Sequence, residues 1–187
     1  MPVWRCQRRV PGKCPQTVQG HIPIGTIHGL GRRQQHRKRT QRVVDTIPRD
    51  RIEWTHHEAK FTLGDLVRHI AATERYMFGE NVQGNDSRYP GHGRELAEDY
   101  DNVMRYFEDM HAEAMDIFAG LTDADLDTKC TTPGGVSMSK WKWLRAMVEH
   151  EVHHRGQIYL MLGMLGVETP PLYGLTSEQV YDRSLHD

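Results

Sequence analysis

The sequence predicts an all-α protein built as a helix bundle. Apolar residues recur at helical spacing in three long segments, 62–80, 94–119 and 139–165, and strand patterns are almost absent. A fourth and shorter helical stretch is predicted over 41–47, because Pro48 disfavours helix immediately before it. Amphipathic helices joined by polar loops bury their apolar faces against one another, which is the packing of a bundle.

Length and composition exclude several classes of protein. The chain has 187 residues, of which 37% are apolar and 26% charged, as expected for one domain with a packed core. No apolar run reaches the ~20 residues of a membrane-spanning helix, and the basic start lacks the apolar stretch of a signal peptide. Cys6, Cys14 and Cys130 are too few and too scattered for a disulfide framework or a four-thiolate zinc site. We therefore expect a cytoplasmic protein without a membrane partner.

Charge divides the chain into two parts. Residues 1–42 contain ten basic residues and no acidic one, which leaves 14 basic and 25 acidic residues, a net charge of −11, in 43–187. We expect 1–42 to be a disordered segment, or not native coding sequence, and 43–187 to be the helix-bundle domain. The basic run at 32–39 is similar to a targeting or nucleic-acid patch, with a solvated tail as the alternative. Nucleic acid is not the expected partner, because the acidic body repels phosphates.

The helix over 62–80 has a recognisable start. Thr62 can cap it, Asp65 occupies the third helical position of a capping box, and an apolar stripe follows. The polar, glycine-rich segment 81–93 is a predicted loop before the helix at 94–119.

The C-terminal third begins with connecting structure. We predict a short connection over 121–127 and a small hairpin over 128–138 around its Pro-Gly-Gly turn. The long helix at 139–165 follows and can end at Gly166. An extended stretch at 169–173 and a last helical turn at 177–182 complete the chain.

Two histidines of the last predicted helix have metal-ligand spacing. His150 and His154 are four residues apart, so they lie on one helix face, within the apolar stripe that faces inward. Two imidazoles on one face can chelate a divalent cation. The same spacing occurs in His-Glu-x-x-His zinc helices, so it is not specific, and ordinary partly buried histidines remain the alternative.

His69 is the best candidate for a third ligand. It lies among core-facing residues of the helix at 62–80, beside Ala71 and Ala72, which allow close helix approach. Three protein ligands leave a coordination position open, as in catalytic metal sites. A histidine bonded to backbone or to a glutamate is the alternative for His69.

Other chemically capable residues have simpler explanations. Glu74 and Glu151 can act as general bases or be exposed helix charges, and Arg155 and Gln157 can orient ligands or pack between helices. Cys130 lacks a visible activating partner, and the Trp141/Trp143 pair is typical of core and rim packing. We interpret the remaining unpaired histidines as surface residues or as support for the ligands: His56, His57, His92, His111, His153 and His186.

Two motifs resemble the DinB superfamily. They are the segment from His150 to Ile158, which reads His-Glu-Val-His-His-Arg-Gly-Gln-Ile, and the segment from Gly64 to Arg75 that contains His69. The stretch from Ile47 to Trp54 is similar to that family's link between its first two helices, and the resemblance extends over roughly 43–173.

The resemblance implies an up-down-down-up four-helix bundle that binds nickel, zinc or iron through His69, His150 and His154. It also implies a homodimer and a reaction between a low-molecular-weight thiol and a small electrophilic substrate, by thiol transfer or hydrolysis. A non-catalytic metal-binding stress-response protein is the alternative. The basic segment 25–42 departs from the family pattern, because it is too poor in apolar residues to cover a bundle through apolar contacts.

Overall fold

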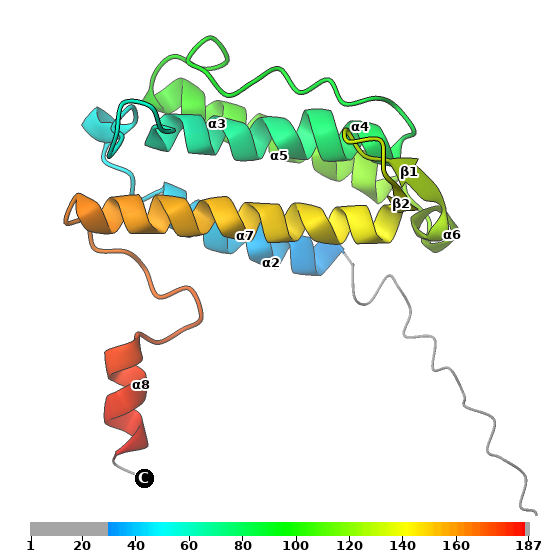
Figure 1. Cartoon of the computed structure of the whole chain (residues 1–187). Helices are drawn as coiled ribbons and strands as arrows, with labels where there is room; N and C mark the ends of the chain where they lie inside the picture. Colours follow the sequence, from blue (N-terminus) through cyan, green and yellow to red (C-terminus); the bar gives the residue numbers. More distant parts are fainter. Residues whose placement is uncertain (1–29, 186–187) are drawn as a thin grey trace, which may run out of the picture.

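The computed structural model describes residues 30–185, with side chains from residue 34 onward. The predicted all-α bundle is confirmed, and its helices pack side by side along one axis (Figure 1). The bundle is formed by α2 (Leu30–Val44), α3 (Leu63–Thr73), α5 (Tyr100–Ala119) and α7 (Lys140–Met164).

The helices run up-down-down-up, as the family resemblance implied. In Figure 1, α2 and α7 run in one direction, whereas α3 and α5 run in the other. The helix that begins as α3 continues through a π-helical stretch, η2 (Glu74–Phe78), into α4 (Gly79–Val82). Because α3 and α5 are parallel, the connection over 83–99 must cross the length of the bundle, and it does so along one side of it (Figure 1).

The predicted capping box of α3 is confirmed. The hydroxyl of Thr62 accepts from the backbone N–H of Asp65 at 2.9 Å, and the Asp65 carboxylate accepts from the backbone N–H of Thr62 at 3.0 Å. Two of the helix's otherwise unpaired N–H groups are thereby satisfied, which fixes where α3 begins.

The predicted start of the next helix at residue 94 is wrong, because α5 begins at Tyr100. Asp99 caps it by accepting from the backbone N–H of Asn102 at 2.9 Å. Upstream, the fully buried Arg68 side chain donates to the carbonyl oxygens of His92 and Ala97, each at 2.9 Å. This buried guanidinium holds the preceding segment in an irregular path.

The structure differs from the expectation for residues 30–42, which are helical and belong to α2. The basic helix covers the bundle partly through polar contacts, because Arg37 and Thr40 are buried together with Val43 and Val44. The Arg37 guanidinium donates to the carbonyl oxygen of Phe107, so its burial does not leave it without a partner. Residues 1–29 of the predicted disordered segment lie outside the described residues.

Two apolar clusters form the core, with a polar layer between them along α7. One cluster includes Ile158 and Leu162, and the other includes Leu144 and Met147. The α7 residues between these positions include His150, Glu151, His154 and Arg155, of which the last three are buried. Polar residues at the centre of a bundle are stable only where other helices supply partners, so this layer is the place to look for a site.

The remaining elements lie at the ends of the bundle. The short connection contains α6 (Asp123–Asp127), and the predicted hairpin is confirmed as β1 (Lys129–Thr131) paired antiparallel with β2 (Ser137–Ser139). The C-terminal α8 (Ser177–Ser184) projects away from the bundle in Figure 1. Among residues 30–185, no helix is long and apolar enough to cross a bilayer.

Candidate metal centre

Three histidines from two helices meet inside the bundle. His69 comes from α3, and His150 and His154 come from consecutive turns of α7. The Nε2 atom of His150 lies 3.1 Å from Nε2 of His69 and 3.1 Å from Nε2 of His154. The potential ligand atoms of all three rings lie within 4.8 Å of one another. Nitrogen atoms at this separation can share one cation, because zinc–imidazole bonds are about 2.0–2.1 Å long.

The surroundings keep these imidazoles neutral. Burial, together with the neighbouring imidazoles, lowers the pKa of His69 to about 3 and that of His150 to about 4. Burial also lowers the pKa of His154, although a hydrogen bond to Gln157 opposes the shift. A neutral imidazole presents a lone pair, so these rings can act as metal ligands at neutral pH without first losing a proton.

Two further side chains orient the rings. The Tyr89 hydroxyl lies 2.7 Å from Nδ1 of His69, and Oε1 of Gln157 lies 2.7 Å from Nδ1 of His154. An oxygen acceptor at Nδ1 favours the tautomer that carries its proton there, which leaves Nε2 free to bind a cation. The Tyr89 hydroxyl also lies 3.0 Å from Nδ1 of His92, so this loop histidine helps to fix the position of the hydroxyl.

The buried carboxylate of Glu80 holds the crossing segment 83–99 against the bundle. Glu80 accepts hydrogen bonds from Arg75, Asn85 and Arg88, the last of which precedes Tyr89. The backbone N–H of Arg88 also donates to the carbonyl oxygen of Tyr76 at 2.8 Å. These contacts fix the backbone beside Tyr89 and therefore the position of its hydroxyl.

A cavity adjoins the histidines. It has a volume of about 550 Å³ and lies between the segment 56–61 and the C-terminal half of α7, with Leu66 of α3 also in its wall. His154 and Gln157 both line it, so the space opens beside one of the three rings. This volume is within the range of small-molecule sites.

The two candidate general bases, Glu74 and Glu151, form hydrogen bonds to residues other than the three clustered histidines. Glu74 and Glu151 are buried rather than exposed, which corrects the simpler explanation given for them. Both carboxylate oxygens of Glu74 lie near Nδ1 of His111, at 3.0 and 3.1 Å, and Glu151 accepts from the Thr40 hydroxyl on α2. Their recorded hydrogen bonds therefore join helices and do not involve the three clustered histidines.

The other candidates have varied positions. Gln157 contacts His154, which agrees with the prediction that it can orient a ligand. Arg155 instead packs between helices, where it donates to the His36 carbonyl and the Thr40 hydroxyl, each at 3.3 Å. Cys130 is buried in the hairpin, where burial raises the pKa of its thiol. Trp141 and Trp143 pack against the apolar cluster that contains Leu144.

The remaining histidines separate into clear classes. His56 lines the cavity, His92 supports Tyr89, and His111 binds Glu74. His57 and His153 are exposed, whereas His186 lies outside the described residues.

Sequence analysis missed Tyr89 and Phe61. The Phe61 ring packs 4.1 Å from that of His92 and 5.5 Å from that of His69, measured between centroids, and it also lines the cavity. The aromatic residue at 89, three positions before His92 in an otherwise polar loop, was the available signal for Tyr89.

Comparisons with known proteins agree with this architecture. A sequence profile of the DinB superfamily matches residues 33–158. The uncharacterized protein YjoA of Bacillus subtilis (strain 168) is 24% identical over 141 residues, which are 74% of this chain and 89% of that protein. Its crystal structure, described as a DinB-like protein, superposes with a TM-score of 0.62 at 20% identity, covering 80% of this chain and 96% of that one.

Two further solved structures have similar folds. A DinB-like protein from Bacillus cereus ATCC 10987 gives a TM-score of 0.61 at 20% identity, over 76% of this chain and 93% of that one. A mycothiol-dependent maleylpyruvate isomerase gives a TM-score of 0.54 at 14% identity, over 73% of this chain and 61% of the isomerase. At these identities the likeness concerns the fold.

Proposed function

Because this chain belongs to the DinB superfamily, we propose that it is a metal-dependent enzyme whose divalent ion is held by His69, His150 and His154. The single observation that carries the proposal is the approach of three Nε2 atoms from two helices. The Nε2 atom of His150 lies 3.1 Å from that of His69 and 3.1 Å from that of His154. The Gln157 oxygen at Nδ1 of His154 supports it, because it favours the tautomer that ligation needs, and the Tyr89 hydroxyl does the same for His69 when it accepts from Nδ1 of His69 and donates to Nδ1 of His92.

The proposed reaction joins a low-molecular-weight thiol to a small electrophile, with hydrolysis of a small substrate as the other possibility for the same site. A bound divalent ion supplies Lewis acidity, which lowers the pKa of a coordinated thiol or water toward neutrality. The three imidazoles hold their lone pairs toward one point, while Tyr89 and Gln157 prevent the outer rings from rotating. The fold shared with a mycothiol-dependent isomerase is consistent with a thiol partner.

The ligand set suits nickel, zinc or iron, because imidazole is a borderline ligand and cellular supply often decides which ion is bound. The test is elemental analysis of the purified wild-type protein and of His69→Ala, His150→Ala and His154→Ala. We expect about one ion per chain in the wild type and its loss in each variant. The control is His57→Ala, since His57 is an exposed histidine in the loop before α3. Wild-type metal content in the three ligand variants would refute the assignment.

The alternative is a metal-binding stress-response protein without catalytic activity. A site sealed by packed side chains would favour that alternative, whereas the cavity of about 550 Å³ beside His154 favours an enzyme. Assays of the metal-loaded protein with bacillithiol, mycothiol and glutathione against a panel of electrophiles separate the two. Turnover that is lost in His154→Ala supports the enzyme, and no turnover with any thiol supports the alternative.

The homodimer also belongs to this proposal. Sedimentation equilibrium of the full chain tests it, with a mass of twice 21.6 kDa as the expected result. A concentration-independent mass of a single chain would contradict it.

A further inference from the structure

The cavity beside the histidines has an apolar wall. Met161 of α7 and Leu66 of α3 line it and are almost fully buried, with 4% and 1% of their surface exposed. Leu160 and Met164 also line it but are largely exposed, so they belong to its mouth. A wall of leucine and methionine side chains binds apolar groups of varied shape, because methionine is flexible and polarizable.

The cavity is lined by basic residues and by no acidic residue. The residues that line it include Lys60, His56 and His154, and no aspartate or glutamate is among them. Within the described part of the chain, Lys60 forms no ion pair, so its charge is available to a ligand. This contrasts with the domain as a whole, since residues 43–187 carry a net charge of −11.

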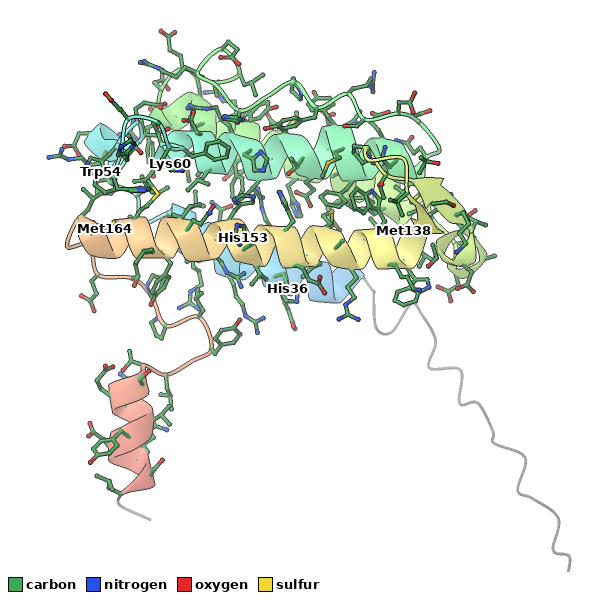
Figure 2. All side chains as sticks on the ribbon, in the orientation of Figure 1. His36, Trp54, Lys60, Met138, His153 and Met164 are labelled. Carbon is green, nitrogen blue, oxygen red and sulfur yellow. The ribbon has the colours of Figure 1, made fainter. Side chains whose placement is uncertain are left out.

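The segment that carries Lys60 is held in place. The backbone N–H of Lys60 donates to the carbonyl oxygen of His57 at 2.9 Å. The Thr55 hydroxyl lies 3.4 Å from the carbonyl oxygen of Lys60. The next residue, Phe61, packs its ring against His92. Figure 2 shows Lys60 and Met164 on facing elements at the same end of the bundle. The backbone of Lys60 is therefore held on the side of the cavity that faces its apolar mouth.

A second cavity of the protein has a lining of mixed charge, unlike the cavity beside His154. It also has a volume of about 550 Å³, but Glu95, Glu98 and Asp109 line it together with Arg94 and Arg105. Its mixed charges do not select an anion, and none of the three clustered histidines lines it.

We propose that the cavity beside His154 binds an amphipathic organic anion, with its carboxylate or sulfonate at Lys60 and its apolar body against Leu66, Leu160, Met161 and Met164. This inference rests on the proposed function, for which it names the substrate class. Because Lys60 and His154 line the same cavity, an anion bound there lies beside one of the clustered histidines.

The experiment measures binding of two fluorescent probes to the full-length protein, both as purified and after treatment with a chelator. The anionic probe is 8-anilinonaphthalene-1-sulfonate, and the uncharged probe is N-phenyl-1-naphthylamine, which has the same aromatic body. Both are titrated into the wild type, Lys60→Met and Lys60→Glu. Lys129→Glu is the matched control, because Lys129 is exposed in the hairpin at the opposite end of the bundle.

We expect Lys60→Met to weaken binding of the anionic probe by about twofold to fivefold, which is the effect of one exposed ion pair. Lys60→Glu weakens it further, whereas the uncharged probe binds the wild type and both Lys60 variants alike, and Lys129→Glu changes neither probe. Leu160→Glu locates the site, since an exposed acidic residue at the mouth weakens the anionic probe most. Failure of the anionic probe to bind, or equal effects of the Lys60 variants on both probes, would overturn the inference.

The design separates this inference from the proposed function. Probe binding that depends on Lys60 in chelator-treated protein supports the cavity assignment without any metal. Metal content of Lys60→Glu equal to that of the wild type shows that the histidine cluster is intact. Loss of Lys60 dependence with normal metal content therefore contradicts only the anion site, whereas unchanged metal content in the histidine variants contradicts only the metal site.

Discussion

The Tyr89 hydroxyl lies 2.7 Å from Nδ1 of His69, although the two residues are 20 positions apart and belong to different parts of the chain. Tyr89 comes from the crossing segment 83–99, and His69 comes from α3. The contact links the path of this long segment to the orientation of a proposed metal ligand. The same tyrosine contacts His92, so the hydroxyl is held between two imidazoles.

The first prediction concerns this contact. Tyr89→Phe removes the hydroxyl but keeps the ring, and we expect it to weaken metal affinity by about tenfold, the lower end of the effect seen when a partner of a ligating histidine is lost. Competition with a chromophoric chelator measures the change. Tyr181→Phe is the control, since Tyr181 is exposed on α8. Equal affinities of Tyr89→Phe and the wild type would show that Tyr89 does not orient the ligand.

The second prediction concerns pH. Because the pKa values of His69 and His150 are lowered to about 3 and about 4, the unfolded chain takes up protons first as the pH falls below about 6.5. The free energy of unfolding of the metal-free protein should therefore be unaffected by these histidines above pH 6.5 and should decrease as the pH falls toward 4. Each histidine contributes a slope of up to about 1.4 kcal/mol per pH unit.

Urea unfolding of chelator-treated protein at several pH values between 7.5 and 5 measures this slope. His69→Gln should flatten it, whereas His57→Gln, which changes an exposed histidine in the loop before α3, should not. A free energy of unfolding that does not change over this range would contradict the neutral, buried state of the cluster.

The third prediction concerns the buried carboxylate that anchors the crossing segment. Burial opposes ionisation of Glu80, but hydrogen bonds from Arg88, Arg75 and Asn85 keep its pKa below the usual value. Glu80→Gln removes the charge that these groups share and should cost about 2–4 kcal/mol of unfolding free energy. Chemical denaturation measures the loss.

The control for this variant is Glu149→Gln, because Glu149 forms only an exposed ion pair with Arg145. We also expect Glu80→Gln to weaken metal binding, since Tyr89 follows Arg88 directly. Stability and metal affinity equal to those of the wild type would show that the segment is held in some other way.

The fourth prediction concerns the basic helix α2. Arg37 is buried, donates to the Phe107 carbonyl oxygen, and lies 3.9 Å from the Glu74 carboxylate. Arg37→Met keeps much of the apolar stem but leaves Glu74 with less compensation, so we expect a loss of about 2–3 kcal/mol. The adjacent Lys38→Met is the matched control, because Lys38 is exposed on the same helix. Thermal unfolding of both variants compares them, and equal midpoints would contradict a packing role for Arg37.

Much of the fold, and the common helix face of His150 and His154, could be predicted from local pattern. Helical periodicity located α3 and α7, and the Thr62–Asp65 box located the start of α3, because these signals depend on neighbours only a few residues away. The spacing of His150 and His154 on one face follows from helix geometry alone.

The sequence pattern failed where long-range contacts override local preference. Nothing near Arg37 in the sequence shows that its guanidinium will lie beside Phe107 and Glu74, so local pattern predicts a disordered segment, or one that is not native coding sequence, where the structure has a helix. Nothing near residue 94 shows that the buried Arg68 will bind the carbonyl oxygens of His92 and Ala97 and delay the next helix. Local pattern likewise favours exposed positions for Glu74 and Glu151, because their hydrogen-bond partners lie on other helices.

Periodicity and residue type were therefore sufficient for the helices and for the pair of histidines on α7, since both depend on a regular backbone repeat. The approach of His69 to that pair, the position of Tyr89 behind it, and the one-sided charge of the neighbouring cavity arise only when α3, α7 and the crossing segment pack together. Side chains far apart in the chain gain defined distances only through packing, because the free energy that orders them comes from the core and from the buried charges that bind the segments to it.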